Sequence, residues 1–297
     1  MNKKKEMLGI LCTLSGGIMW GFSGSCGQYL FGTGMTSNYL VPLRMLSSGI
    51  ILLIVSILFQ RENFIGILKN KKDLLTAVLF GIFGIIISQY FYLAAIEHSN
   101  AGTATVLQYL GPAMIMIYIC FKNRRLPTKT EAACLILAIS GTFILATHGN
   151  FNSLSISPKA LIFGLCAAAG LMLYSLIPEK IIPIYGALTV TGLGMTVGGS
   201  VLFLTMQPWK LSYSWNLPAA AAFAAIIVFG TVLAYTLYLK GVGLIGASKA
   251  SVISCIEPVS AAVFSAVWLG TGFAAPDIIG FIFIIGTVII LSLAKQK

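Results

Sequence analysis

The chain has 297 residues, of which 58% are hydrophobic and only 9% are charged, and its formal net charge is +11. Because soluble domains carry roughly 25% charged residues, this composition excludes a water-soluble globular protein and indicates an integral membrane protein. The positive charge does not indicate a nucleic-acid partner, since the basic residues lie in short breaks between apolar runs and form no continuous basic face.

A helix needs about 20 mainly apolar residues to cross a bilayer. The sequence has ten such stretches, and we predict an all-α integral membrane protein with ten transmembrane helices. The first stretch is too long for the apolar core of a signal peptide, which has about 7–15 residues. The predicted spans are Leu8–Phe31, Asn38–Phe59, Leu74–Ile96, Ala101–Phe121, Thr130–Thr147, Ala160–Ile177, Ile184–Met206, Leu217–Leu239, Gly246–Leu269 and Pro276–Ala294.

The distribution of basic residues between the loops predicts the orientation of the chain. Most of the 19 Lys and Arg residues lie on the side of the N-terminus, whereas only Lys159 and Lys210 lie in loops on the opposite side. Short cytoplasmic loops are enriched in Lys and Arg. We therefore expect a multi-pass protein of the cell membrane with both termini in the cytoplasm.

The two halves of the sequence are similar to each other. NAGTATVLQYLGPA at Asn100–Ala113 is matched by GASKASVISCIEPV at Gly246–Val259, and Tyr92 falls on Tyr238 at the same offset of 146 residues. Such internal repeats define the architecture of a chain. We predict two related units, residues 1–150 and residues 151–297.

Each predicted unit contains five spans, which is an odd number. The second unit must therefore enter the membrane upside down relative to the first, giving two inverted five-helix repeats. Inverted repeats are common in secondary transporters, where a site between the repeats opens alternately to each side of the membrane.

One carboxylate lies deep in a predicted span. Glu257 is eleven residues after Gly246, or about 16 Å at 1.5 Å per residue, which places it near the middle of the bilayer. A carboxylate there costs about 2.5–3.5 kcal/mol and often marks a pathway or a proton site. Glu257 is interpreted either as a proton site or as a structural contact that holds the bundle together.

The two repeat-related prolines, Pro112 and Pro258, predict helix kinks, because proline removes a backbone hydrogen bond, and broken helices line transporter cavities. Arg44 lies about 9 Å inside the second span. Its long side chain favours an anchor at the membrane interface over a contact with substrate. Two small-residue spacings, Gly17-x3-Gly21 and Gly194-x3-Gly198, are predicted to be helix-packing positions.

Polar and aromatic residues gather in the first, third, fourth, eighth and ninth spans. For any single Ser or Thr, a local backbone bond is the simpler interpretation, but as a set these residues predict a wet central cavity. The candidate cavity residues are Trp20, Gln89, Tyr92, Thr105, Gln108, Tyr109, Tyr235, Tyr238, Ser251 and Ser254.

Several sequence signatures of enzymes are absent. The chain has no HExxH, no GxSxG and no Walker loop, each of which would carry a defined chemistry. We therefore predict no catalytic residue, no metal and no cofactor, and we expect an ion gradient to drive any transport.

Four features together resemble the EamA group of the drug/metabolite transporter superfamily. They are Trp20-Gly21, Leu43-Arg44, the tight hairpin that leads to Gly111-Pro112, and Ile256-Glu257-Pro258. The resemblance implies two inverted five-helix repeats, a central cavity lined by spans one, three, four, six, eight and nine, and transport of small metabolites, especially amino acids. In span six, Leu171–Tyr174 stands where the family has an aromatic-rich run, and its Trp is missing.

The favoured function is a secondary transporter that exports a small metabolite such as an amino acid by alternating access, with a proton as the candidate coupling ion. One alternative is efflux of cationic drugs, for which aromatic walls supply cation–π contacts. An alternative of another class is a non-transporting membrane scaffold or an intramembrane enzyme. The sequence leaves the substrate, the direction and the oligomeric state open, and a monomer is compatible with it.

Overall fold

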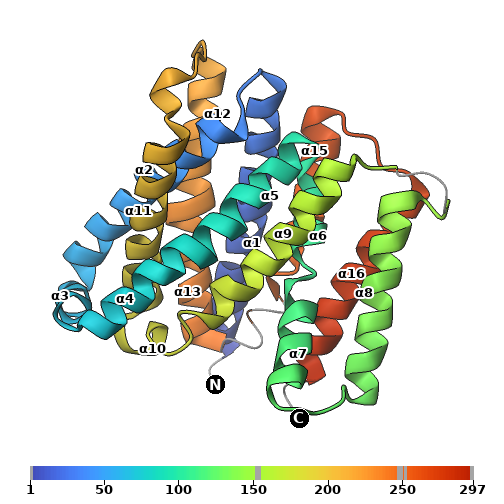
Figure 1. The fold of residues 1–297 in the computed structure, drawn as a ribbon, viewed down its shortest axis with the longest axis horizontal. Coiled ribbons are helices and arrows are strands. Elements are labelled where there is room, and N and C mark those ends of the chain that lie inside the picture. The colour runs from blue at the N-terminus through green and yellow to red at the C-terminus, as the bar shows by residue number, and fades with distance from the viewer. Residues whose placement is uncertain (1–2, 151–154, 246–249, 251–252, 295–297) are drawn as a thin grey trace.

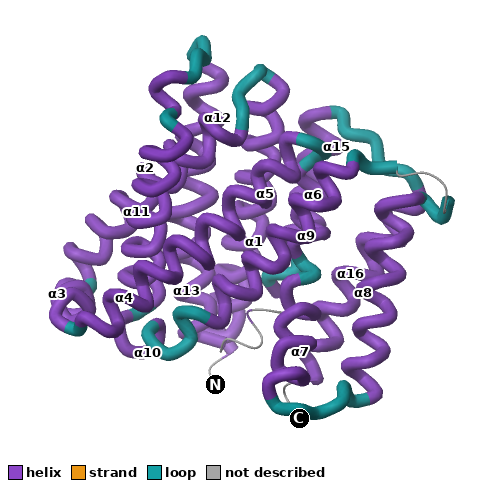
Figure 2. Tube along the Cα trace, viewed as in Figure 1, coloured by secondary structure: helices purple, strands orange, loops and turns teal. Residues whose placement is uncertain are grey.

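The computed structural model describes residues 3–150, 155–245, 250 and 253–294, and every regular element in these ranges is a helix (Figures 1 and 2). The predicted all-α class is therefore confirmed for the described part of the chain. Ser251 and the beginning of the predicted ninth span, residues 246–249, lie outside the described residues.

The helices follow one another with short connections. The first half contains α1 (Lys3–Gly32), α2 (Ser37–Phe59), α3 (Arg61–Lys69), α4 (Lys71–Leu79), η1 (Phe80–Ile86), α5 (Ile87–Glu97), α6 (Ala101–Gln108), α7 (Gly111–Lys122) and α8 (Lys129–Thr147). The second half contains α9 (Pro158–Leu176), α10 (Ile182–Tyr185), α11 (Ala187–Met206), η2 (Pro208–Lys210), α12 (Leu217–Ile227), η3 (Val228–Leu233), α13 (Ala234–Ile245), α15 (Ile256–Leu269) and α16 (Ala275–Ala294).

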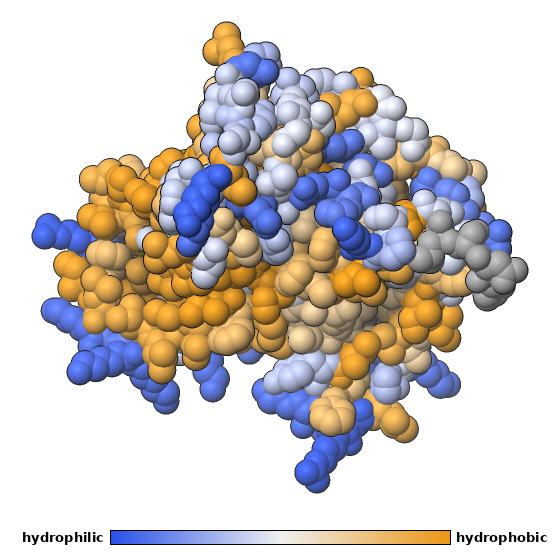
Figure 3. Space-filling view, turned by 45° about the horizontal axis from the view of Figure 1, so that its top comes forward, coloured by the Kyte–Doolittle hydropathy of each residue, from blue (hydrophilic) through white to orange (hydrophobic). Residues whose placement is uncertain are grey.

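Eight helical stretches of the described chain are long and apolar enough to cross a membrane, and Ile256–Leu269 and Ala275–Ile290 are shorter apolar helices. Figure 3 shows a broad apolar band across the visible face, with hydrophilic side chains projecting beyond it. Large apolar side chains such as Leu58 and Val267 are 71% and 83% exposed. Because soluble proteins avoid extensive apolar surfaces, this band fits contact with lipid, and the molecule is a multi-pass membrane protein.

Side chains cap several helix starts. Asn100, Ser157 and Asn216 accept hydrogen bonds from the backbone N–H groups of the first turns of α6, α9 and α12. Thr128 and Glu131 form a complete capping box at the start of α8. These side chains satisfy backbone donors that have no partner within the helix, and they therefore fix where each helix begins.

Four predicted spans are interrupted well inside their length. The third and eighth spans contain π-helical segments, η1 and η3, between their two α-helical parts. The fourth span is broken by a turn at Tyr109–Leu110, just before Pro112, and a corresponding turn at Ser254–Cys255 precedes α15. The same two irregularities thus occur at related places in both halves. Apolar periodicity could not predict the π segments, because a π-bulge changes the backbone without changing the composition.

The main helix pairs join the two halves of the chain. Helix α2 packs on α11, α1 on α13, α5 on α9, and α8 on α16. Figure 1 shows the beginning of α1, α3, α10 and the end of α16 at the same end of the bundle. The two halves therefore share one interior and do not form separate cores.

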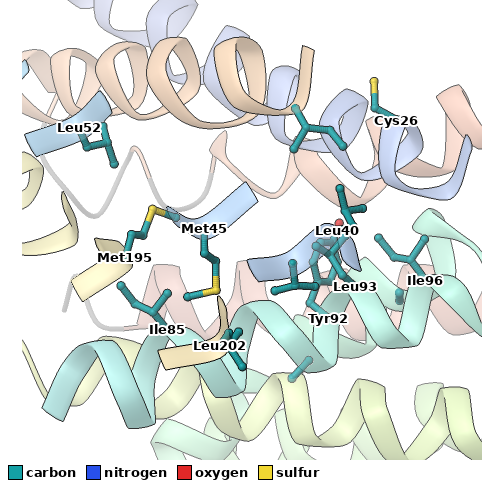
Figure 4. Packing of buried hydrophobic residues seen from close by; sticks show 14 of the residues in the cluster. Cys26, Leu40, Met45, Leu52, Ile85, Tyr92, Leu93, Ile96, Met195 and Leu202 are labelled. Atoms are coloured by element: carbon teal, nitrogen blue, oxygen red, sulfur yellow. The ribbon is translucent and has the colours of Figure 1, made fainter. Parts of the chain in front are cut away.

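Glycines let several of these helices approach closely. A Cβ on Gly49 of α2 would lie 2.5 Å from the Thr196 backbone nitrogen of α11, and one on Gly199 would lie 2.6 Å from the Leu46 nitrogen. Figure 4 shows Met45 of α2 near Met195 and Leu202 of α11 in the same region. The predicted packing role of the GxxxG spacings is confirmed, since a Cβ on Gly21 would lie 2.6 Å from the Ala261 nitrogen and one on Gly198 would lie 2.7 Å from the Gly81 oxygen.

Candidate functional site

A cavity of about 490 Å³ lies between the two halves of the bundle. Its walls come from most of the helices at which the two halves meet. They include α2 and α11, which the family resemblance did not imply as walls. The lining residues are Trp20, Ser23, Gly24, Arg44, Ser88, Gln89, Tyr92, Gln108, Tyr109, Pro112, Leu171, Tyr174, Ile182, Ala187, Thr191, Gly230, Tyr235, Tyr238, Leu239, Val242, Ser254, Glu257 and Val288.

Aromatic rings form one wall of this cavity. The Trp20 ring lies 5.3 Å from the Tyr235 ring and 5.1 Å from the Tyr238 ring, measured between centroids. Tyr174 of α9 adds its hydroxyl, 3.4 Å from that of Tyr235. Span six therefore does supply an aromatic contact to the cavity, although it lacks the tryptophan of the family pattern. Such a wall offers flat apolar faces together with polar hydroxyl groups.

A second wall is held in place by hydrogen bonds between side chains. The Tyr92 hydroxyl lies 2.9 Å from the Thr105 oxygen, and Thr105 donates to the Ala101 carbonyl at 2.7 Å. The Gln108 amide donates to the Ser88 hydroxyl at 3.2 Å. Because each of these polar groups has a partner, the apolar surroundings do not leave it unsatisfied.

The third wall joins the two repeat-related helix breaks. Tyr109, at the turn between α6 and α7, donates its hydroxyl to the Ser254 carbonyl and to Oε2 of Glu257, both at 3.0 Å. Glu257 lies in the first turn of α15. The helix break exposes the Ser254 carbonyl to a side chain from the other half, as expected where irregular backbone lines a cavity.

The structure overturns the interpretation of Arg44 as an interfacial anchor. Its side chain is only 8% exposed and it lines the cavity. The position of Arg44 near one end of α2 suggested an outward-reaching side chain, but the helix face that carries it is turned toward the bundle interior. Charged side chains within membrane helices usually face the bundle interior or a water-filled cavity.

The predicted site residues differ in where the structure places them. Thr105 lies behind Tyr92 and does not reach the cavity, whereas Ser251 lies outside the described residues. Pro258 is buried in the first turn of α15, next to the cavity residue Glu257. The structure brings together Trp20, Gln89, Tyr92, Gln108, Tyr109, Pro112, Tyr235, Tyr238, Ser254 and Glu257.

Sequence reasoning missed Ser23, Ser88 and Thr191 as lining residues. Each is a single small hydroxyl group in an apolar run, and such residues usually bond to their own backbone. The repeat offered no signal for them. Only the helix orientation, which depends on tertiary packing, reveals that they face the cavity.

A hydrogen-bond network surrounds Gln28, which lies near the end of α1 and one turn after the cavity residue Gly24. The Gln28 carbonyl oxygen accepts from the Ala101 nitrogen at 2.8 Å and from the Ser265 hydroxyl at 2.6 Å. Its amide nitrogen donates to Thr271 at 2.9 Å. The network joins α1, α6 and α15. At the opposite end of the bundle, the cavity lining reaches Ile182 of α10.

Gln28→Leu is expected to destabilise the protein by about 1–3 kcal/mol, because the Ala101 N–H and the Ser265 hydroxyl would lose their partner in a buried environment. Thermal unfolding of the detergent-purified protein measures the effect. Gln89→Leu is the matched control, since the Gln89 amide forms no hydrogen bond with the described residues. Equal midpoints for the two variants would show that the Gln28 network does not hold the helix ends together.

The comparisons with a protein family, with related sequences and with a solved structure give consistent results. The model of the EamA-like transporter family matches residues 7–147 and again residues 158–293. The chain is 39% identical over 292 residues to the uncharacterized inner membrane transporter YicL of Salmonella typhimurium, covering 97% of this chain and 96% of that one. It is 24% identical to the uncharacterized transporter YcbK of Bacillus subtilis, covering 71% and 70%. A protein of known crystal structure has a TM-score of 0.63 at 16% identity, with 97% of each chain covered, and shows a similar fold.

Proposed function

Because the chain belongs to the EamA-like transporter family and is therefore a membrane transporter and not an enzyme, we propose that it is a secondary transporter that moves a small metabolite by alternating access. The observation that carries the mechanism is the cavity, which is built jointly by both halves of the chain. A site between two repeats can open to either side as the repeats rock against each other.

Two inverted five-helix repeats, residues 1–150 and 151–297, form the proposed architecture, with ten crossings and both termini in the cytoplasm of a cell-membrane protein. The pairing of helices supports this proposal. Exchanging the halves converts the α1–α13 pair into the α9–α5 pair, while α2–α11 and α8–α16 convert into themselves. The recurrence of the π segments and of the helix breaks supports the same relation.

The described arrangement corresponds to the cytoplasm-facing state in the proposed cycle. The cavity reaches α10, which the charge distribution assigns to the cytoplasmic side, and the Gln28 network lies at the opposite end. Outward opening would require the ends of α1, α6 and α15 to separate. Hydrogen bonds at 2.6–2.9 Å between a few side chains can be broken and remade at modest net cost, which suits a gate.

An amino acid or a related compound is the proposed substrate class, and export is the proposed direction. The cavity carries a positive group, Arg44, and a negative group, Glu257, beside the aromatic wall. These groups would suit the carboxylate and the amino group of such a molecule. Efflux of organic cations is the second candidate, since Glu257 and the aromatic rings would also suit a cation.

Flux measurements on the purified protein in liposomes test the proposed function. Labelled amino acids, purines and organic cations are screened with and without an imposed pH gradient. We expect saturable flux of one class, strongest for amino acids, with a dependence on the gradient. Absence of flux for every class, from protein shown to be folded, would contradict the transporter proposal as stated.

Trp20→Ala is expected to lower this flux by at least about tenfold. The variant removes the ring against which both Tyr235 and Tyr238 pack, and buried aromatic groups commonly contribute more than 1.4 kcal/mol to binding. Trp209→Ala is the matched control, because Trp209 is 55% exposed at a helix connection and does not line the cavity. Equal flux in both variants would show that the transported substrate does not contact the aromatic wall.

A further inference from the structure

Arg44 is a buried cation without a direct hydrogen-bond or ion-pair partner among the described residues. It is 8% exposed, its Nε atom has no hydrogen-bond partner in that part of the chain, and the ion pairs found there, Arg125–Glu131 and His148–Asp277, do not include it. A charge in a membrane interior without a direct hydrogen-bonded counter-ion is costly. A cation that is retained there, facing a cavity, is explained most simply by an anionic group that enters the cavity.

Ser23 has the same property on the neighbouring wall. It is 3% exposed, its Oγ has no hydrogen-bond partner within the described ranges, and it lines the same cavity. Ser23 lies against Gly230 of η3, and the adjacent Thr231 accepts a hydrogen bond at 3.2 Å from Ser48, one turn after Arg44. The two groups therefore lie on helices, α1 and α2, that both pack against η3. Both can donate a hydrogen bond.

The number of charges in the cavity limits the kind of anion. Arg44 is the one basic residue among the described lining residues, and Glu257 supplies a negative charge elsewhere in the same space. A phosphate dianion would exceed the single positive charge and would be repelled by Glu257. A carboxylate has one charge and matches the planar fork of a guanidinium, which can donate two parallel hydrogen bonds.

We infer that Arg44, assisted by the Ser23 hydroxyl, binds the carboxylate group of the transported molecule. Glu257 and the aromatic wall then face its remaining part, which fits an amino group and an apolar side chain. This inference rests on the proposed transport function and makes its substrate class specific. It disfavours simple organic cations, since Arg44 would repel them.

Binding measurements on the purified protein in detergent test the inference. The probes are L-alanine, L-leucine and L-phenylalanine, each beside its amide, in which a neutral group of the same shape replaces the carboxylate. We expect at least one amino acid to bind at least about tenfold more tightly than its amide, since hydrogen bonds to charged groups are the stronger ones. In Arg44→Gln this preference for the acid is expected to disappear.

Three further variants make the test specific. Arg44→Lys keeps the charge but not the planar fork and should retain part of the preference, and Ser23→Ala should weaken it severalfold. Arg61→Gln is the matched control, because Arg61 is exposed at the start of α3 and does not line the cavity. If Arg44→Gln fails to fold, the preference of Arg44→Lys and Ser23→Ala for acids over amides decides whether the inference holds.

Equal binding of acids and amides by the wild-type protein, binding of no probe, or a preference that survives in Arg44→Gln would overturn the carboxylate site. Tighter binding of the amides, which carry a net positive charge, would overturn it in favour of cations. None of these results contradicts the transporter proposal, which is tested separately by liposome flux of all three compound classes.

Discussion

Glu257→Gln is expected to abolish flux driven by a pH gradient while the protein folds normally. Glutamine keeps a carbonyl oxygen that can accept the hydrogen bond from Tyr109, which spans 3.0 Å in the structure, but it cannot bind and release a proton. The variant thus separates the two interpretations of this carboxylate. Gradient-driven uptake into liposomes is the measurement, and it should fall to the level of liposomes without protein.

Glu97→Gln is the matched control for this prediction. Oε2 of Glu97 accepts from the Ser37 nitrogen at 2.8 Å, and the side chain does not line the cavity. The same loss of charge there should leave the gradient dependence unchanged. Wild-type coupling in Glu257→Gln would refute the proton role, whereas loss of folded protein would favour the structural role.

The proposed roles of Arg44 and Glu257 are physically linked. Both side chains line one cavity, so the empty site contains one positive and one negative group. A bound amino acid adds a carboxylate beside Arg44 and an ammonium group beside Glu257, so the loaded site is neutral while Glu257 is ionised. Because net charge is costly in a low-dielectric membrane interior, this neutral loaded site would change conformation more readily than a site that holds a single unpaired charge.

The membrane class and the two-repeat organisation could be predicted from the sequence, because the apolar stretches and the matching segments recur along the chain. Ten apolar stretches predicted a membrane protein, and the match between Asn100–Ala113 and Gly246–Val259 related the halves. The depth of its carboxylate in a predicted span selected Glu257, and the gathering of polar and aromatic residues selected Tyr109. The structure brings these two side chains into contact. Repetition works because two related halves that pack against each other place equivalent positions around a common interior.

The orientation of single side chains could not be predicted in the same way. Arg44 lies near a helix end, where an anchoring role is the usual outcome, yet it is buried and lines the cavity. Ser23 is one hydroxyl in an apolar run. Whether such a residue faces lipid, a helix or a cavity depends on tertiary packing, which hydropathy does not contain.

Gly170→Ala is expected to destabilise the protein by about 1–3 kcal/mol or more, the usual cost of overpacking a tight interface. A Cβ on Gly170 of α9 would lie 2.6 Å from the Ser88 Cα and 2.7 Å from the Ile87 carbonyl carbon of α5. These are backbone atoms, so no side chain can rotate away and the helices must separate. Since Gln108 bonds to Ser88, the cavity wall would move with them.

Gly243→Ala in α13 is the matched control for the loss of stability, because a Cβ there would meet no atom within 4 Å. Alanine has a higher helix propensity than glycine, by up to about 1 kcal/mol, so this variant should unfold at the same temperature as the wild type or higher. Thermal unfolding of the three proteins in one detergent gives the comparison. A Gly170→Ala midpoint equal to that of Gly243→Ala would mean that α5 and α9 can separate without cost, and the rigid contact between the two halves would then have to lie elsewhere, at α2 and α11.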